Sequence, residues 1–197
     1  KQSRDYDSFQ MKSEFPSTAE EAFQSTGRRA FPLNYVLNAR KYNRNPEYVG
    51  DLYADSRKGK KALKNVRFEI VEQGPLKIWA KPAKIKNIKN RYAAFADIGG
   101  TTDKADWSVV RIIDRAPMVA GAKPKMVATW RGHLDQDLFA WKAAQLAKYY
   151  HNALLAIEVN SLRSKTIEEN EGNHAMTVLD EISPYYDNLF YRTDPQK

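Results

Sequence analysis

The sequence predicts a mixed α/β domain, and three observations lead to this fold class. Four short apolar runs are expected to be strands: 92–98, 107–114, 125–131 and 153–159. Apolar residues at helical spacing predict one helix at 134–151, before the last of these strands, and another at 173–182 after it. Three strands ahead of the first helix predict antiparallel neighbours followed by a parallel crossover.

The hairpin expected over residues 92–115 carries the main chemical signal. Its first apolar run ends abruptly in Asp97, and two consecutive glycines then allow a tight turn beside that carboxylate. Asp103 and Asp106 follow on the return path, although Asp103 is expected to be a loop residue rather than a ligand. Clustered carboxylates repel one another unless a cation lies between them, so a divalent metal is expected here.

A fifth strand expected at 188–192 completes a mixed five-stranded sheet flanked by helices, and this order of elements fits a ribonuclease H-like fold. In that fold the first strand is central and the fourth lies beside it, so Asp97 and Glu158 would face each other. With Asp106 from the loop they would hold one or two hard cations, and a metal pair about 4 Å apart can hydrolyse a phosphodiester. The alternatives are a turn-capping Asp97 and an ion pair between Glu158 and Lys165.

Residues 1–90 are expected to form an N-terminal extension ahead of a nuclease core at 91–197. A capping box at Ser17 predicts a short helix at 18–25, and a second helix is expected at 33–43. Runs at 66–71 and 76–80 around a Gln-Gly turn predict a β-hairpin within this arm.

The chain is basic, with 32 Lys and Arg against 24 Asp and Glu and a pI near 9.5. Two basic runs lie at 56–66 and 81–91, and they are either solvated surface or contacts to a nucleic-acid backbone. The candidate DNA contacts are Lys60, Lys61, Lys84, Lys86, Lys89 and Arg91. Trp107 and Trp141 are expected in the core, and His133, His151 and His174 at surface or capping positions. The absence of cysteine excludes disulfides and cysteine-based zinc sites, and no apolar run approaches the length of a membrane span, so no membrane partner is expected.

Three segments occur in an informative order: Glu-Phe-Pro-Ser-Thr-Ala-Glu-Glu-Ala-Phe at 14–23, Asp-Ile-Gly-Gly at 97–100 with Asp-Trp-Ser-Val at 106–109, and Ala-Ile-Glu-Val-Asn at 156–160. Together they resemble the C-terminal nuclease domain of the large terminase subunit of tailed bacteriophages. The resemblance implies a metal-dependent endonuclease that cuts concatemeric viral double-stranded DNA during genome packaging. It also implies Mg²⁺ or Mn²⁺ bound by Asp97 and Glu158, with Asp106 assisting.

The same resemblance implies a third metal-binding aspartate after the fifth strand. Asp187 and Asp194 are available, but the family position is expected beyond Lys197, which would leave this core truncated at its C-terminus and weakly active or inactive. The implied partners are the ATPase domain of the full-length protein, a portal protein and a small terminase subunit, in the cytoplasm of a bacterial host.

Two other functions remain open from the residues alone. The Asp-Ile-Gly-Gly-Thr stretch at 97–101 also resembles the first phosphate loop of actin-like sugar kinases, although no later Gly-x-Gly cluster accompanies it. A non-catalytic DNA-binding or assembly module would explain the basic runs equally well.

Overall fold

The structure is a computed structural model that describes residue 17 and residues 33–84, 88–102, 104–158 and 174–191. The chain divides into two compact units, residues 1–45 and 46–197. In the first unit, α3 (Leu33–Arg40) occupies most of the helix predicted at 33–43. The helix predicted at 18–25 lies outside the described residues.

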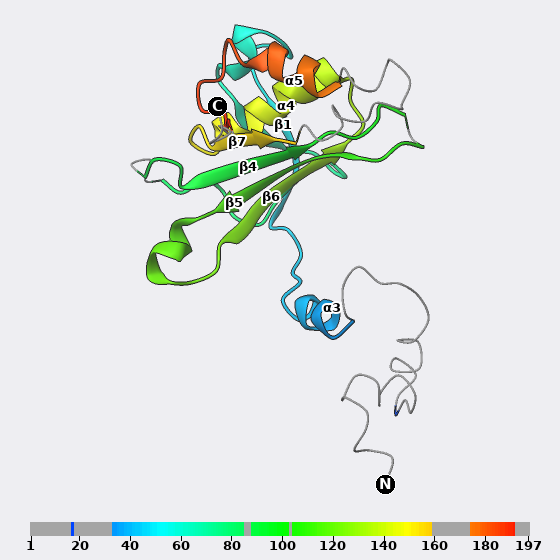
Figure 1. The fold of residues 1–197 in the computed structure, drawn as a ribbon, viewed down its shortest axis with the longest axis vertical. Coiled ribbons are helices and arrows are strands. Elements are labelled where there is room, and N and C mark those ends of the chain that lie inside the picture. The colour runs from blue at the N-terminus through cyan, green and yellow to red at the C-terminus, as the bar shows by residue number, and fades with distance from the viewer. Residues whose placement is uncertain (1–16, 18–32, 85–87, 103, 159–173, 192–197) are drawn as a thin grey trace, which may run out of the picture. The chain divides into compact units, whose positions relative to one another are not determined.

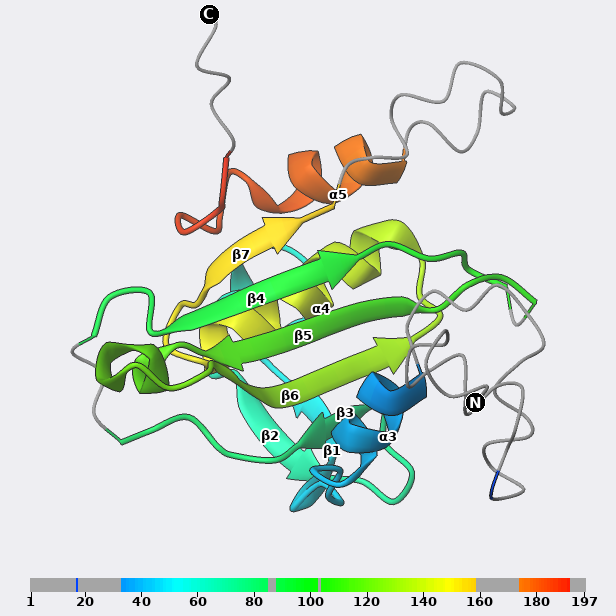
Figure 2. The ribbon, with the colours of Figure 1, turned by 60° about the horizontal axis from the view of Figure 1, so that its bottom comes forward.

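The second unit is built on one mixed sheet with the strand order β2-β1-β3-β6-β5-β4-β7 (Figure 1, Figure 2). Its strands are β1 (Tyr48–Tyr53), β2 (Arg67–Ile70), β3 (Leu76–Ile78), β4 (Tyr92–Asp97), β5 (Ser108–Asp114), β6 (Lys125–Gly132) and β7 (Leu154–Ile157). Neighbouring strands pair antiparallel except β4 and β7, which are parallel. The predicted sequence of three antiparallel strands and a parallel crossover is therefore confirmed.

The crossover is α4 (Gln136–Tyr149), which runs between β6 and β7 and covers one face of the sheet (Figure 2). Phe139, Ala143 and Leu146 recur on one side of this helix and are fully buried, which explains why the sequence folds it onto the sheet. The helix α5 (His174–Ile182) packs on α4, and the indole Nε1 of Trp141 donates a hydrogen bond to Glu181. Both helices match the ranges predicted for them.

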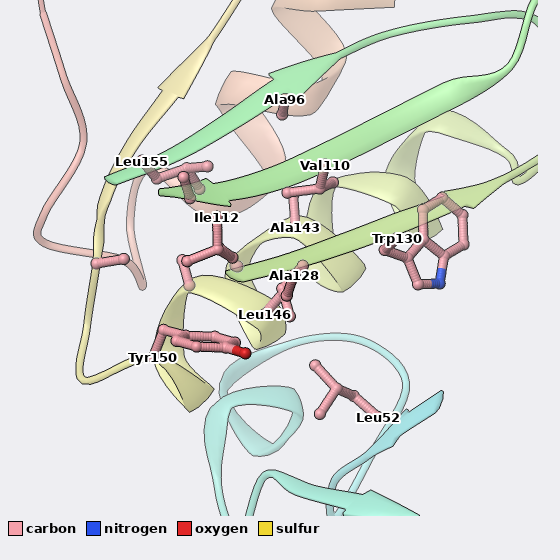
Figure 3. Close-up of a cluster of buried hydrophobic side chains, with 14 of the residues drawn as sticks. Leu52, Ala96, Val110, Ile112, Ala128, Trp130, Ala143, Leu146, Tyr150 and Leu155 are labelled. Carbon is pink, nitrogen blue, oxygen red and sulfur yellow. The ribbon is translucent and has the colours of Figure 1, made fainter. Parts of the chain in front are cut away.

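Small side chains allow the helix to approach the sheet closely. Figure 3 shows Ala143 of α4 facing the sheet near Ala128 of β6, with Val110 and Ile112 of β5 between the strands and the helix. Burial alternates along β4 and β5, so that Ala96 and Val110 are buried while Phe95 is 52% exposed. The sheet therefore has one face in the core and one open to solvent.

The predicted N-terminal hairpin is wrong in its pairing. β2 and β3 do occur near the predicted ranges, but β1 lies between them and pairs with both. β1 was not predicted from the sequence, because Gly50 and Asp51 interrupt its apolar pattern. Gly50 is required there, since a Cβ atom would lie 2.0 Å from the carbonyl oxygen of Glu69 on β2.

The five-stranded sheet differs from the prediction at both edges. β3 pairs with β6, which extends the sheet to seven strands and places the predicted boundary at 90/91 inside it. The fifth strand expected at 188–192 is reduced to an isolated parallel bridge between Leu155 and Leu189. Two backbone hydrogen bonds accompany that bridge, from Leu155 to Asn188 and from Phe190 to Leu155.

Two short 3-10 helices complete the unit, η2 (Lys60–Leu63) and η3 (Ala116–Ala120). None of the helices formed by the described residues is long and apolar enough to cross a bilayer.

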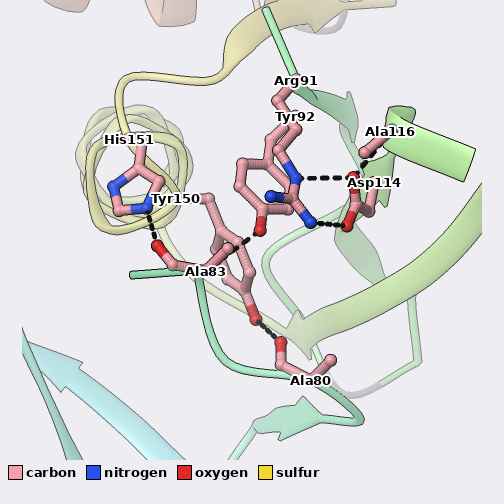
Figure 4. A network of polar contacts seen from close by, with 8 residues as sticks. All are labelled: Ala80, Ala83, Arg91, Tyr92, Asp114, Ala116, Tyr150 and His151. Atoms are coloured by element: carbon pink, nitrogen blue, oxygen red, sulfur yellow. Dashed lines mark hydrogen bonds and ion pairs between the residues drawn. The ribbon is translucent and has the colours of Figure 1, made fainter. Parts of the chain in front are cut away.

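A polar network anchors the segment that leads into β4 (Figure 4). The Tyr150 hydroxyl donates to the Ala80 carbonyl at 2.7 Å, and a ring nitrogen of His151 lies 2.6 Å from the Ala83 carbonyl. Arg91 makes two hydrogen bonds to Asp114, at 3.0 and 2.8 Å. Burial tends to raise the pKa of Asp114, but the bonds from Arg91 and the Ala116 N–H outweigh it and lower that pKa.

Arg91 therefore has a structural role, because its ion pair with Asp114 joins the start of β4 to the end of β5. Its side chain is 22% exposed and that of Asp114 is 14% exposed, so breaking the pair leaves a carboxylate largely shielded from water. We expect Arg91→Met to lower the free energy of unfolding by about 1–3 kcal/mol, measured by urea denaturation at pH 7. The matched control is Arg67→Met, whose pair with Glu69 is exposed and worth at most about 1 kcal/mol.

The sign of the pH dependence follows from the lowered pKa of Asp114. The stabilisation is complete above the unfolded-state pKa of about 3.9 and is lost as pH falls through the lower folded-state value. The difference between wild type and Arg91→Met should therefore shrink in acid. An equal loss of stability in both arginine variants at pH 7 would contradict this role.

Candidate functional site

The parallel pairing of β4 with β7 sets the position of the two predicted carboxylates. Phe95 is paired with Ala156 and Ala96 with Ile157, and the Glu158 N–H donates to the Ala96 carbonyl at 3.0 Å. The next residues along the two strands are Asp97 and Glu158, so the carboxylates leave neighbouring strands at the same level.

The two carboxylates also lie on one face of the sheet. Side chains alternate along a strand, and Asp97 shares the exposed side of β4 with Phe95 while Ala96 points into the core. Asp97 and Glu158 both line a hollow of about 430 Å³ on the face opposite α4. Adjacent strands are about 4.8 Å apart, which brings both carboxylates within reach of one cation. We call this hollow the carboxylate hollow; Arg111 and Phe190 complete its wall.

Comparisons with known proteins yield one structural similarity. No family model matches the sequence. No curated protein matches it either. A similar solved structure is the large terminase nuclease from the thermophilic phage G20c with bound magnesium, which shares 13% sequence identity with this chain at a TM-score of 0.41. The match covers 64% of this chain and 55% of that one, so this chain spans little more than half of its length.

The third predicted ligand, Asp106, is placed differently from the other two. Its carbonyl accepts a hydrogen bond from the Gly100 N–H at 2.9 Å, but its side chain is exposed and does not line the carboxylate hollow. Asp103 lies outside the described residues. Within the part of the chain that the structure describes, no three Asp, Glu or His side chains are grouped as a metal site.

Two carboxylates suffice for the metal that the sequence predicted. Mg²⁺ is commonly bound by one or two carboxylates and completes its octahedron with water and substrate phosphates. Asp97 and Glu158 supply hard oxygen donors at an open surface, so the residues present fit Mg²⁺ or Mn²⁺.

The aspartate proposed to follow the fifth strand does not join this site through Asp187. Its carboxylate accepts a hydrogen bond from the Asn152 amide at 2.9 Å, and this bond lowers its pKa. Asn152 precedes β7 whereas Glu158 follows it, so Asp187 lies at the other end of the strand. Asp194 lies outside the described residues.

The loop after Asp97 packs on its own return path. A Cβ atom on Gly99 would lie 2.2 Å from the Asp106 carbonyl oxygen, and the Gly99 N–H donates to the buried Ser108 hydroxyl at 3.0 Å. This packing favours a hairpin turn over an open phosphate loop. The role of Ser108 in this loop was not predicted, because a serine that begins a strand has no distinctive sequence signal.

His133, which directly follows β6, supports the same loop. Its Nδ1 lies 3.1 Å from the Gly100 carbonyl oxygen, and its ring lies 4.0 Å from that of Trp107. Trp107 is 45% exposed, so the prediction of a core position was wrong, whereas Trp141 is buried as predicted. Arg131 covers Trp107 with its guanidinium 4.2 Å from the ring centre.

The predicted DNA contacts lie away from the carboxylate hollow. Lys60 and Lys61 belong to η2, which packs against α4 on the other side of the sheet. Lys84, Lys89 and Arg91 precede β4, at the end opposite Asp97, and Lys86 lies outside the described residues.

The cations on the open face of the sheet are different residues. Arg111 is paired with Phe95 across β4 and β5, and it lines the carboxylate hollow. Arg131 of β6 is opposite Val109 of β5, and Lys77 of β3 is opposite Thr129 of β6. Arg111, Arg131 and Lys77 are all exposed. These cations were not predicted as contacts because they are scattered among apolar residues of their strands, whereas the prediction relied on runs of basic residues.

The glycine loop gives a test of this packing. A Cβ atom on Gly100 would lie 2.3 Å from the Cβ of Ala105. The next contact, with the Cα of Ala105, is at 3.7 Å, which is an ordinary van der Waals distance. We expect Gly100→Ala to lower the free energy of unfolding in urea by about 1–3 kcal/mol, and Gly100→Ala/Ala105→Gly to recover most of that loss. Gly99→Ala has no such rescue, because the clash there is with backbone. Equal stability of the single and double Gly100 variants would contradict this loop geometry.

Proposed function

We propose that this chain is a metal-dependent endonuclease of the ribonuclease H-like type, acting on double-stranded DNA as terminase large-subunit nucleases do. The observation that carries the proposal is the meeting of Asp97 and Glu158 at the ends of adjacent parallel strands, on the open face of the sheet. The sequence resemblance to terminase nuclease motifs at these same positions supports it further.

The two carboxylates would hold Mg²⁺ or Mn²⁺. When bound, such an ion activates water and neutralises charge on a phosphodiester. Asp97 and Glu158 contribute negative charge to the hollow, and this charge would attract the cation. Their placement on paired strands fixes the distance between them before any ligand arrives, which lowers the cost of assembling the site.

Arg111 is the residue that we assign to the scissile phosphate. It lies on the strand next to Asp97 and shares the wall of the carboxylate hollow. A guanidinium binds a phosphate through two parallel N–H bonds, which would orient the phosphate toward the carboxylate side of the hollow.

The DNA backbone would continue across the open face from β4 toward β3. Arg111 on β5, Arg131 on β6 and Lys77 on β3 stand on successive strands. Arg111 and Lys77 are both opposite Thr129 of β6, and Arg131 lies two residues further along that strand. This row of cations replaces the basic runs as the proposed phosphate contacts.

The wider biological setting belongs to the same proposal. The substrate would be concatemeric viral DNA cut during genome packaging in the host cytoplasm. The partners would be an ATPase domain of the full-length protein, a portal protein and a small terminase subunit.

A second candidate is a DNA-binding or assembly module without catalysis. It is favoured by one observation, that the described residues group two carboxylates rather than three in the hollow. DNA binding without any metal-dependent nicking would support this alternative.

Plasmid nicking tests the catalytic proposal. Asp97→Asn and Glu158→Gln should each reduce Mn²⁺-dependent nicking of supercoiled plasmid by at least about 100-fold, because each removes one ligand charge. The matched control is Asp187→Asn, at the other end of β7, which should nick as wild type does. Circular dichroism checks that all variants fold. Undiminished nicking by Asp97→Asn and Glu158→Gln would indicate a contaminating nuclease and would reject the assignment.

Salt dependence tests the row of cations. Each lost phosphate contact should reduce the slope of log affinity against log salt by about 1, so Arg111→Gln/Arg131→Gln should reduce it by about 2. Lys60→Gln/Lys61→Gln carries the same charge change on the α4 side and should leave the slope unaltered. Affinities are measured by fluorescence anisotropy in Ca²⁺. If the lysine double variant lowered the slope and the arginine double variant did not, the basic run at 56–66 would be the contact surface instead.

A further inference from the structure

Two exposed phenylalanine rings stand in the wall of the carboxylate hollow. Phe95 of β4 is 52% exposed and Phe190 is 54% exposed, and both line the hollow together with Arg111. None of the ring contacts between the described residues involves either phenylalanine. Exposed apolar side chains that gather beside charged groups mark a binding surface, so we asked which ligand these rings fit.

Backbone hydrogen bonds hold Phe190 in register with β7. The Leu155 N–H donates to the Asn188 carbonyl at 2.9 Å, and the Phe190 N–H donates to the Leu155 carbonyl at 2.8 Å. This is the pattern of a parallel ladder in which Leu155 and Leu189 are partners. Leu189 packs against the core, so alternation along the chain directs Phe190 to the open face of the sheet.

Ala156 therefore lies between the two phenylalanines. It follows Leu155 and is next to Phe190 on one side, and it is paired with Phe95 of β4 on the other. Neighbouring strands are about 4.8 Å apart, so the backbones of Phe95 and Phe190 are about 10 Å apart. A methyl group fills little of the space between them. We call the space over Ala156, with Phe95 and Phe190 at its sides, the phenylalanine slot.

The width of the phenylalanine slot suits one flat ring. Stacked bases in nucleic acid are separated by about 3.4 Å, so a ring held between two others requires about 7 Å in all. The backbones beside Ala156 are about 10 Å apart, and the two phenylalanine rings can cover both faces of a base by leaning slightly toward it. The slot is therefore too narrow for two stacked bases and suits a single one.

The charges beside the phenylalanine slot select the rest of the ligand. Arg111 is paired with Phe95 across β4 and β5 and lines the same hollow as Asp97 and Glu158. A guanidinium favours a phosphate, and the two carboxylates favour a cation that can neutralise one. A nucleotide carries a flat ring and a phosphate within one unit, whereas an apolar peptide side chain would offer nothing to Arg111.

We infer that the phenylalanine slot holds one unpaired nucleobase of the DNA whose phosphate lies at Arg111. This inference rests on the DNA substrate of the proposed function. Neighbouring bases cover both faces of each base in an intact duplex, so the phenylalanines can contact a base face only after that base leaves the stack. Stacking on an aromatic ring accepts any base, so the slot selects an unpaired nucleotide rather than a sequence.

Two short duplexes that differ by one base provide the test. One carries a single bulged thymidine, and the other carries an abasic nucleotide at the same bulge, which keeps the phosphates and removes only the ring. Fluorescence anisotropy in Ca²⁺ measures both affinities. We expect the wild-type chain to bind the thymidine bulge at least about fivefold more tightly than the abasic bulge.

Two kinds of variant show whether the phenylalanine slot causes that preference. Phe95→Leu/Phe190→Leu removes both rings but keeps apolar side chains, and Ala156→Leu fills the slot but keeps both rings. Each should bind the two duplexes equally. The matched control is Tyr191→Leu, which alters a 65% exposed aromatic residue outside the hollow and should keep the preference. Circular dichroism checks that each variant folds.

The outcomes separate this inference from the nuclease proposal. Equal affinity of the wild-type chain for the two duplexes would overturn the inference, and so would a preference that persists in the double phenylalanine variant. Nicking is measured separately. A base preference without metal-dependent nicking would reject the nuclease and keep the phenylalanine slot, whereas nicking without a base preference would reject the slot and keep the nuclease.

Discussion

The parallel pairing of β4 with β7 is the constraint on which the site depends. Only a crossover can bring two strands together in parallel, and α4 supplies it by packing its alanine-rich side on the sheet. The pairing places Asp97 and Glu158, which are 61 positions apart in the sequence by their numbers, at one edge of the sheet. Without α4 the two carboxylates would have no defined relationship.

The same helix gives the two faces of the sheet different characters. On the α4 side the strands contribute Ala96, Val110 and Trp130 to a dense core. On the other side the same strands present Asp97, Arg111 and Arg131 to solvent. Alternation along each strand therefore separates an exposed face that carries these charges from a face that is packed in the core.

The central elements were predictable because their patterns are strong and local. β4, β5, β6 and β7 are short apolar runs, α4 has apolar residues at helical spacing, and the order of these elements specifies the parallel crossover. The partnership of Asp97 and Glu158 followed from that order. β1 was missed because Gly50 is required by the approach of β2, which is a tertiary contact without a local signal.

The surface was less predictable, because a linear run of lysines does not reveal which face it occupies. The run around Lys60 packs beside α4, and Arg91 is engaged with Asp114. The cations on the open face are scattered through strands rather than gathered in runs, and they can be recognised only when the register is known. The contacts of His133 with Gly100 and Trp107 are likewise tertiary, so no local sequence pattern could predict them.

The most direct test of the central claim is a crystal of this chain soaked in MnCl₂ and measured at the manganese absorption edge. Our account predicts an anomalous peak bridging the side chains of Asp97 and Glu158, with oxygen distances of roughly 2.0–2.3 Å to both. A peak bound by only one of them, or a well-occupied manganese elsewhere with none in the carboxylate hollow, would contradict it.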